Sequence, residues 1–194
     1  LHKVRIFVRS SFDKPEDIDP HGTPPGTLIC DEEDIVEQQT VTGIAFSKDE
    51  AQISVRHVPD KPGIAAAIFG PLAEASINVD MIVQNVSEDG FTDMTFTVQS
   101  ADYDRAVEVL KKVKETIGYF DLRGSTDVAK VSAIGVGMRS HAGVAAQMFS
   151  ALAEKGINIE AISTSEIKIS VLIDAAYAEL AVRTLHSLFG LDGK

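Results

Sequence analysis

One stretch of this chain is a gapless copy of another stretch that lies 80 residues earlier. Residues 63–82 align with residues 143–162, and ten of the twenty paired positions are identical. Unrelated segments of this length would share only about one or two identities, so the match indicates an internal duplication. Whatever fold the chain adopts must therefore contain two related units.

Hydrophobic periodicity assigns secondary structure to the first copy. Apolar residues at spacings of three and four follow Pro62 and predict a helix that ends at residues 76–78, and Asp89-Gly90 is a strong hairpin turn signal. The other predicted elements are strands at 51–58, 79–86, 91–98 and 119–122 and a helix at 101–116. This order, β-α-β-β-α-β, is the ferredoxin-like arrangement of the α+β class.

The second copy repeats most of this pattern but lacks room for its last strand. Its predicted elements after the duplicated helix are strands at 159–164 and 167–173 and a helix at 175–189. A strand candidate at 41–46, followed by a polar turn at 47–50, has no role in the first copy. We therefore expect the first unit, residues 51–124, to be inserted in the second, which comprises residues 41–46 and 128–194.

Residues 1–40 have a different character. The first ten residues alternate apolar and charged side chains, which predicts a strand. Four of the seven prolines fall within residues 11–27, and an acidic run follows at 31–37, so this part is interpreted as an exposed connector.

The composition argues against several functional classes. A net charge of −11 and 6% aromatic residues disfavour nucleic-acid binding, and no apolar stretch approaches the ~20 residues that a membrane span needs. A single cysteine, Cys30, is typical of a reducing compartment, most simply the cytoplasm. The chain has no phosphate-binding glycine motif, and its five histidines show no metal-ligand spacing. We predict no catalytic residue and no metal ligand in this chain.

Duplicated polar residues and glycines suggest a binding site. Gly63 and Gly143 open the two duplicated helices, where backbone N–H groups attract an anion. Asp60 is predicted at the helix N-cap, and Asn78 and Asn158 are expected at the end of the fold that faces the helix starts. Each of these residues also has a purely structural interpretation as a helix cap. Together they favour a site for a free α-amino acid.

The sequence resembles the paired ACT domains in the regulatory region of aspartate kinases over nearly its whole length. The resemblance rests on DKPGIAAAIFGPLAEASINVDMIVQNVS, on SHAGVAAQMFSALAEKGINIEAISTSEIKISVLI and on VTGIAFSKDEAQISV. VRIFVRSSF followed by GTLI resembles the junction at which the kinase domain ends, so residues 1–40 would be junction and linker. The KFGGTS-like kinase motif is absent. Both an excised regulatory region and a separate regulatory (beta) subunit fit this resemblance.

The resemblance implies a regulatory function. Aspartate kinases phosphorylate the side-chain carboxylate of aspartate with ATP, and their ACT regions bind end-product amino acids and inhibit the kinase. The implied ligands are L-lysine and/or L-threonine, with no cofactor in this chain and ATP confined to the kinase domain. The implied partners are a second copy, which forms a homodimer through the ACT domains, and the kinase domain or alpha subunit. The alternative is an ACT regulatory subunit of another amino-acid biosynthetic enzyme.

The resemblance also implies which residues contact the effector, at contacts between the first repeat of one chain and the second repeat of another. The first repeat would contribute Asp60, Lys61, Pro62, Gly63, Ile64, Ala65, Asn78, Val79, Asp80 and Gln84. The second would contribute Val144, Ala145, Asn158, Ile159, Ser165 and Glu166.

Overall fold

The computed structural model describes residues 6–8, 27–29, 40–86, 89–135 and 143–192. Two compact units divide the chain at Gln38–Gln39. In the first unit, β1 (Ile6–Val8) pairs antiparallel with β2 (Thr27–Ile29). The predicted N-terminal strand is confirmed over β1, whereas the acidic run and most of the predicted connector lie outside the described residues.

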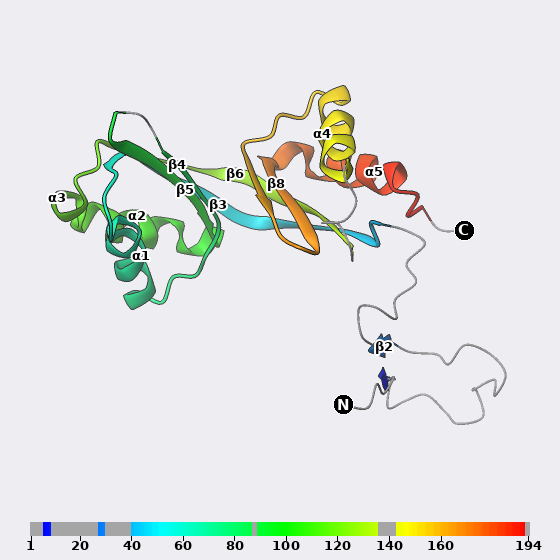
Figure 1. The fold of residues 1–194 in the computed structure, drawn as a ribbon, viewed down its shortest axis with the longest axis horizontal. Helices are drawn as coiled ribbons and strands as arrows, with labels where there is room; N and C mark the ends of the chain where they lie inside the picture. The colour runs from blue at the N-terminus through cyan, green and yellow to red at the C-terminus, as the bar shows by residue number, and fades with distance from the viewer. Residues whose placement is uncertain (1–5, 9–26, 30–39, 87–88, 136–142, 193–194) are drawn as a thin grey trace. The chain divides into compact units, whose positions relative to one another are not determined.

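The second unit is built on one six-stranded antiparallel sheet with the order β4-β5-β3-β6-β8-β7 (Figure 1). Its strands are β3 (Gly43–Pro59), β4 (Val79–Val86), β5 (Phe91–Val98), β6 (Asp121–Ile134), β7 (Ala161–Thr164) and β8 (Lys168–Asp174). Its helices are α1 (Ile64–Glu74), α2 (Tyr103–Lys112), α3 (Lys114–Ile117), α4 (Val144–Glu154) and α5 (Ala178–Leu188), with short 3₁₀ turns η3 (Ser100–Asp102) and η5 (Ala175–Tyr177).

Strands β3 and β6 are long enough to serve both copies. Residues 43–47 of β3 pair with 130–134 of β6, which pairs in turn with β8. Residues 52–56 of β3 pair with 121–125 of β6 on one side, and residues 51–55 and 58–59 pair with β5 on the other. The segment before the first copy thus lies beside the first strand of the second copy. The α+β class with two interleaved ferredoxin-like units is confirmed.

The predicted turn at 47–50 is wrong, because β3 runs straight through it. Pairing with β6 shifts register on both sides of Glu50, and the Asp49 N–H donates to Ser47 Oγ at 3.2 Å. These polar residues form an irregular stretch of strand, and Glu50 itself is buried. Likewise, the short strand predicted at 119–122 is the start of β6, and the helix predicted at 101–116 is divided into η3, α2 and α3.

Each copy has its own hydrophobic core between its half of the sheet and its helices. In the first copy, α1 contributes Ile68 and Leu72, and β5 contributes Phe96, all fully buried. In the second copy, α4 contributes Met148 and Leu152 at equivalent positions. The second core also contains Val41 and has Ile44 packed against it, although both residues precede the first copy in sequence.

Candidate functional site

The two duplicated helices start in the same way. Gly63 and Gly143 occupy the N-cap positions of α1 and α4 with φ angles of 91° and 106°, a left-handed conformation that side chains disfavour. Neither cap is made by a side chain, so the prediction of Asp60 as the N-cap is wrong. Asp60 is exposed in the preceding loop, where its N–H donates to the Gly90 carbonyl at 2.9 Å.

The structure places Asn78 at the far end of the first copy from this helix start. Val79 pairs with Val98, the same residue that pairs with Ala51, whereas the other end of β4 pairs with Thr92, beside the end of β3. Strand β4 therefore runs parallel to β3, because α1 carries the chain back across the sheet. The prediction that Asn78 faces the helix start of its own copy is wrong for this reason.

The predicted site residues consequently form two groups in each copy. We call them the glycine end, which contains the helix start, and the asparagine end, which contains the start of β4 or the residues before β7. The glycine end of the first copy holds Asp60, Lys61, Pro62, Gly63, Ile64 and Ala65, with Gln84 on the nearer half of β4. The glycine end of the second copy holds Val144, Ala145, Ser165 and Glu166. The asparagine ends hold Asn78, Val79 and Asp80 in the first copy and Asn158 and Ile159 in the second.

Exposure differs within the glycine ends. Ile64 and Val144 are buried and support the helix starts, whereas Lys61 and Ala65 are exposed. The Ser165 N–H donates to the Lys168 carbonyl at 2.7 Å and closes the turn between β7 and β8. This turn lies beside the end of β6, from which the chain proceeds to α4.

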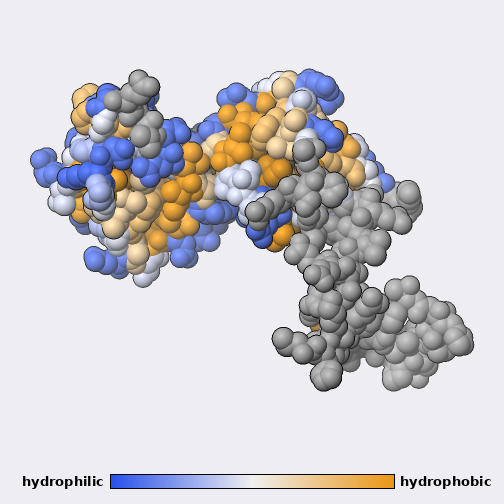
Figure 2. Space-filling model, in the orientation of Figure 1, coloured by the Kyte–Doolittle hydropathy of each residue, from blue (hydrophilic) through white to orange (hydrophobic). Residues whose placement is uncertain are grey.

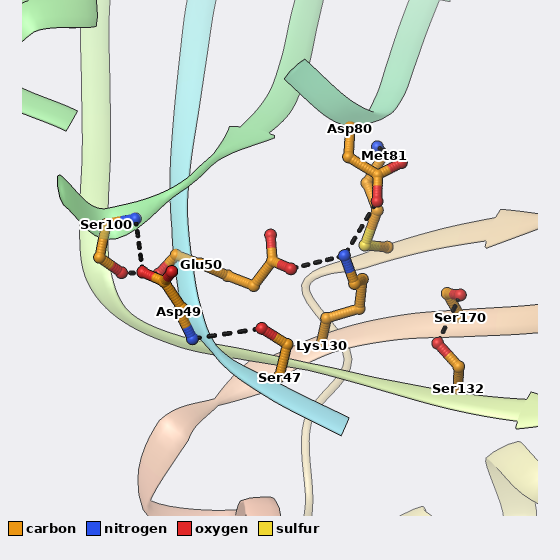
Figure 3. Close-up of polar contacts among 9 residues, drawn as sticks. All are labelled: Ser47, Asp49, Glu50, Asp80, Met81, Ser100, Lys130, Ser132 and Ser170. Carbon is orange, nitrogen blue, oxygen red and sulfur yellow. Dashed lines mark hydrogen bonds and ion pairs between the residues drawn. The ribbon is translucent and has the colours of Figure 1, made fainter. Parts of the chain in front are cut away.

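An ion-pair cluster lies at the asparagine end of the first copy (Figure 3). Lys130 Nζ in β6 lies 2.5 Å from Glu50 Oε1 in β3 and 2.9 Å from Asp80 Oδ2 in β4. The Lys130 and Glu50 side chains are only 19% and 9% exposed, compared with 56% for Asp80. The hydrogen bond from Lys130 lowers the pKa of Asp80, against the opposing effect of burial. Although burial alone would lower the pKa of Lys130, its hydrogen bonds to Glu50 and Asp80 raise it.

Sequence reasoning missed both Lys130 and Glu50. They occupy equivalent positions, 80 residues apart, with opposite charges. That difference in charge between the copies was the one signal in the sequence of an ion pair between the two residues.

The ion-pair cluster borders a hollow of about 240 Å³, which suits a small polar group. The polar residues that line it are Ser47, Asp49, Glu50, Asn78, Asp80, Thr97, Gln99 and Lys130. A second hollow of about 460 Å³ is lined by Arg56, His57, Asp93, Phe120, Asp121 and Arg123, none of them predicted site residues. Within the described residues, no group of three or more acidic, histidine or cysteine side chains could hold a metal, and no helix is long and apolar enough to cross a membrane.

Comparison with known protein families defines the class. Residues 51–115 and 131–189 each match a family model described as an ACT domain. Both matched segments carry the duplicated glycine, helix and asparagine, so the chain is a tandem ACT-domain protein.

Its relatives narrow the family further. The aspartokinase of Pseudomonas aeruginosa is 57% identical over 170 residues, which cover 87% of this chain and 41% of that protein. The aspartokinase of Helicobacter pylori is 49% identical over 193 residues, covering 97% of this chain and 45% of that protein. The chain thus spans less than half the length of these curated relatives.

Solved structures agree with this assignment. The regulatory subunit of aspartate kinase from Thermus thermophilus is 47% identical, with a TM-score of 0.74, and the match covers 78% of this chain and 99% of that subunit. A structure of aspartokinase alpha and beta subunits is 57% identical, with a TM-score of 0.73, over 77% of this chain and 99% of the matched chain. The chain belongs to the aspartokinase family and comprises its paired ACT domains, as the sequence motifs predicted.

Proposed function

We propose that this chain is the amino-acid-binding regulatory part of an aspartate kinase. In this proposal, L-lysine and/or L-threonine binds the ACT domains and inhibits the ATP-dependent phosphorylation of L-aspartate by the kinase domain or alpha subunit. The observation that carries the proposal is the match over 99% of a regulatory subunit of aspartate kinase, joined to the duplicated glycine-capped helix starts.

The chemistry of the glycine end suits the carboxylate and ammonium groups that all free α-amino acids share. The first turn of α1 begins after an exposed loop, and the backbone N–H groups at such a helix start can stabilise a carboxylate. Asp60 lies three residues before the N-cap with an exposed side chain that can accept a hydrogen bond from an ammonium group. This end alone recognises no side chain, so specificity requires a second surface.

The asparagine end supplies that second surface only from another unit, because it lies at the opposite end of its own copy. Two ACT units placed side by side, with their strands in opposite directions, would bring the glycine end of one beside the asparagine end of the other. A ligand held between them stabilises that arrangement over others, and inhibition follows as a shift in population.

The open edges of the sheet fit such pairing between chains. Strands β4 and β7 form the two edges, and each carries an exposed isoleucine at the equivalent position, Ile82 at 50% and Ile162 at 42%. Apolar residues reach the surface of both repeats in Figure 2. Because unpaired strand edges favour association, we infer that two copies form a homodimer through the ACT domains. As the single cysteine suggests, we propose the cytoplasm as the compartment of this dimer.

Thermal unfolding tests the proposal. L-lysine, L-threonine or both, at millimolar concentration, should raise the unfolding temperature of the chain, since a ligand at 100 times its Kd stabilises by about 2.7 kcal/mol. D-lysine and L-norleucine serve as controls for stereochemistry and for the side-chain amine. If neither L-lysine nor L-threonine changes the unfolding temperature, the proposed ligands are wrong.

A further inference from the structure

The two repeats meet at a junction that belongs to neither hydrophobic core. Met81, the third residue of β4, is 4% exposed and packs with Val128 of β6 and Leu172 of β8. Ala161, at the start of β7, packs against the same three residues. The asparagine end of the first copy therefore contacts the second copy within one chain.

Ion pairs of Lys130 link the two repeats at this junction. It bridges Glu50 and Asp80 through its ammonium group, and Val131, the next residue of β6, lies in the core of the second copy. Asp80 uses both of its carboxylate oxygens, because Oδ2 accepts from Lys130 and Oδ1 accepts from the Met81 N–H at 2.8 Å. Asp80 therefore links β4 to Lys130 of β6, and we call this contact the Asp80–Lys130 tie.

The backbone of β4 is distorted where the tie is made. Met81 has a φ angle of 46°, and the pairing of β4 with β5 shifts register between Asp80 and Val83. A left-handed conformation is unfavourable for methionine and persists only where surrounding contacts enforce it. The Lys130 ion pair on one side and the burial of Met81 on the other supply those contacts. The Asp80–Lys130 contact is thus one of the interactions that hold this strained segment.

Among the described residues of the second copy, no equivalent tie is found. Glu160 is the counterpart of Asp80 at an offset of 80 residues, but the counterpart of Lys130 is Glu50, which carries the same charge as Glu160. Burial, together with the negative charge of Asp174, raises the pKa of Glu160. Within the part of the chain that the structure describes, a cation from the other repeat thus holds the asparagine end of the first copy but not that of the second.

We propose that Lys130 is a positioning residue that couples the start of β4 to the second ACT repeat. A ligand that contacts Asn78 or Val79 at the asparagine end acts on the start of β4, and it therefore either strengthens or strains the Asp80–Lys130 tie. Any resulting movement of β4 is transmitted through Lys130 to β6 and the core of the second copy. The identity of the ligand comes from the proposed function, so the coupling rests on that proposal. The ion pair between Asp80 and Lys130 does not depend on it.

Two measurements on the full chain test the coupling. The first is the affinity for L-lysine and L-threonine, by calorimetry, in Lys130→Met and Lys130→Arg. We expect Lys130→Met to weaken binding at least fivefold, the low end of typical coupling factors, and Lys130→Arg to recover part of the loss. Arg123→Met is the matched control. Arg123 is another β6 cation paired with a carboxylate, that of Asp121, but its side chain is 68% exposed and the residue pairs with Ser54, toward the other end of β6 from Lys130.

The second measurement is a double-mutant cycle of Lys130→Met with Asp80→Asn, read from urea unfolding midpoints without ligand. The two changes should be non-additive, because each removes the same contact. Since Lys130→Met leaves Glu50 buried without its cation, Glu50→Gln/Lys130→Met provides a background that folds if the single variant does not. Wild-type affinity in Lys130→Met, or additivity in the cycle, would overturn the proposal. If the wild-type chain binds neither amino acid, the proposed function fails while the cycle still decides the tie.

Discussion

Gly135 offers a sharp test of the interleaved fold. It is buried at the end of β6, and its N–H donates to the Ile167 carbonyl at 3.0 Å. A Cβ at this position would overlap the Thr40 carbonyl group and lie 3.0 Å from Val41 Cα. Both neighbours are backbone, so no side chain can rotate away to make room. The contact exists only because the segment before the first copy lies against the end of β6.

Gly135→Ala should therefore destabilise the chain markedly. Overpacking typically costs about 1–3 kcal/mol, and a rigid backbone neighbour places the cost near the upper end, about 2–3 kcal/mol. For a chain of this size that corresponds to a decrease in Tm of roughly 5–10 °C. Urea unfolding and calorimetry measure both quantities.

Gly43→Ala is the matched control. Gly43 is the first residue of β3, its φ is not in the left-handed region, and an added Cβ would meet no heavy atom within 4 Å beyond its chain neighbours. The same substitution should change the stability there by no more than about 0.5 kcal/mol. If Gly135→Ala were as stable as the wild type, Thr40 and Val41 could not lie against the end of β6, and the interleaved arrangement would be refuted.

The proposed ligand contacts at Asp60 and Ser165 are exposed, so Asp60→Ala and Ser165→Ala should weaken binding of lysine or threonine while changing stability by no more than about 0.5 kcal/mol. Unchanged calorimetric affinity in both variants would locate the pocket elsewhere. The raised pKa of Glu160 means that the native state holds this proton more tightly than the unfolded state, so the associated stability is lost as pH rises from about 4.5 through the native pKa. Glu160→Gln should remove that part of the fall in urea midpoint. Residues 128–194 expressed alone should show no cooperative unfolding, because they lack 41–46; a cooperative transition would contradict the proposed division into domains.

Local sequence patterns sufficed for much of the fold. The predicted strands at 79–86 and 91–98 match β4 and β5 residue for residue, since alternation and the Asp89-Gly90 turn fix both ends. The duplication identified both α1 and α4 and their glycine starts. The strand predicted at 41–46 had no role in the first copy, and the second copy lacked one strand. These two facts together predicted that residues 41–46 lie beside β6.

Features that depend on contacts between distant strands were not predictable in this way. Polar residues at 47–50 have the composition of a turn, and only pairing with β6 keeps them in a strand. By contrast, the position of Asn78 follows from the predicted β-α-β order, because the strands before and after a crossover helix run parallel and place the start of β4 level with the start of the first-copy strand. The Lys130 cluster joins three strands from both repeats, so no local pattern contains it.

Isothermal titration of the full chain with L-lysine and L-threonine, separately and together, tests the central claim most directly. Saturable heat is expected from at least one of them, with an affinity that Asp60→Ala reduces. The absence of binding heat from both amino acids, at millimolar concentration and with a folded chain, would contradict it.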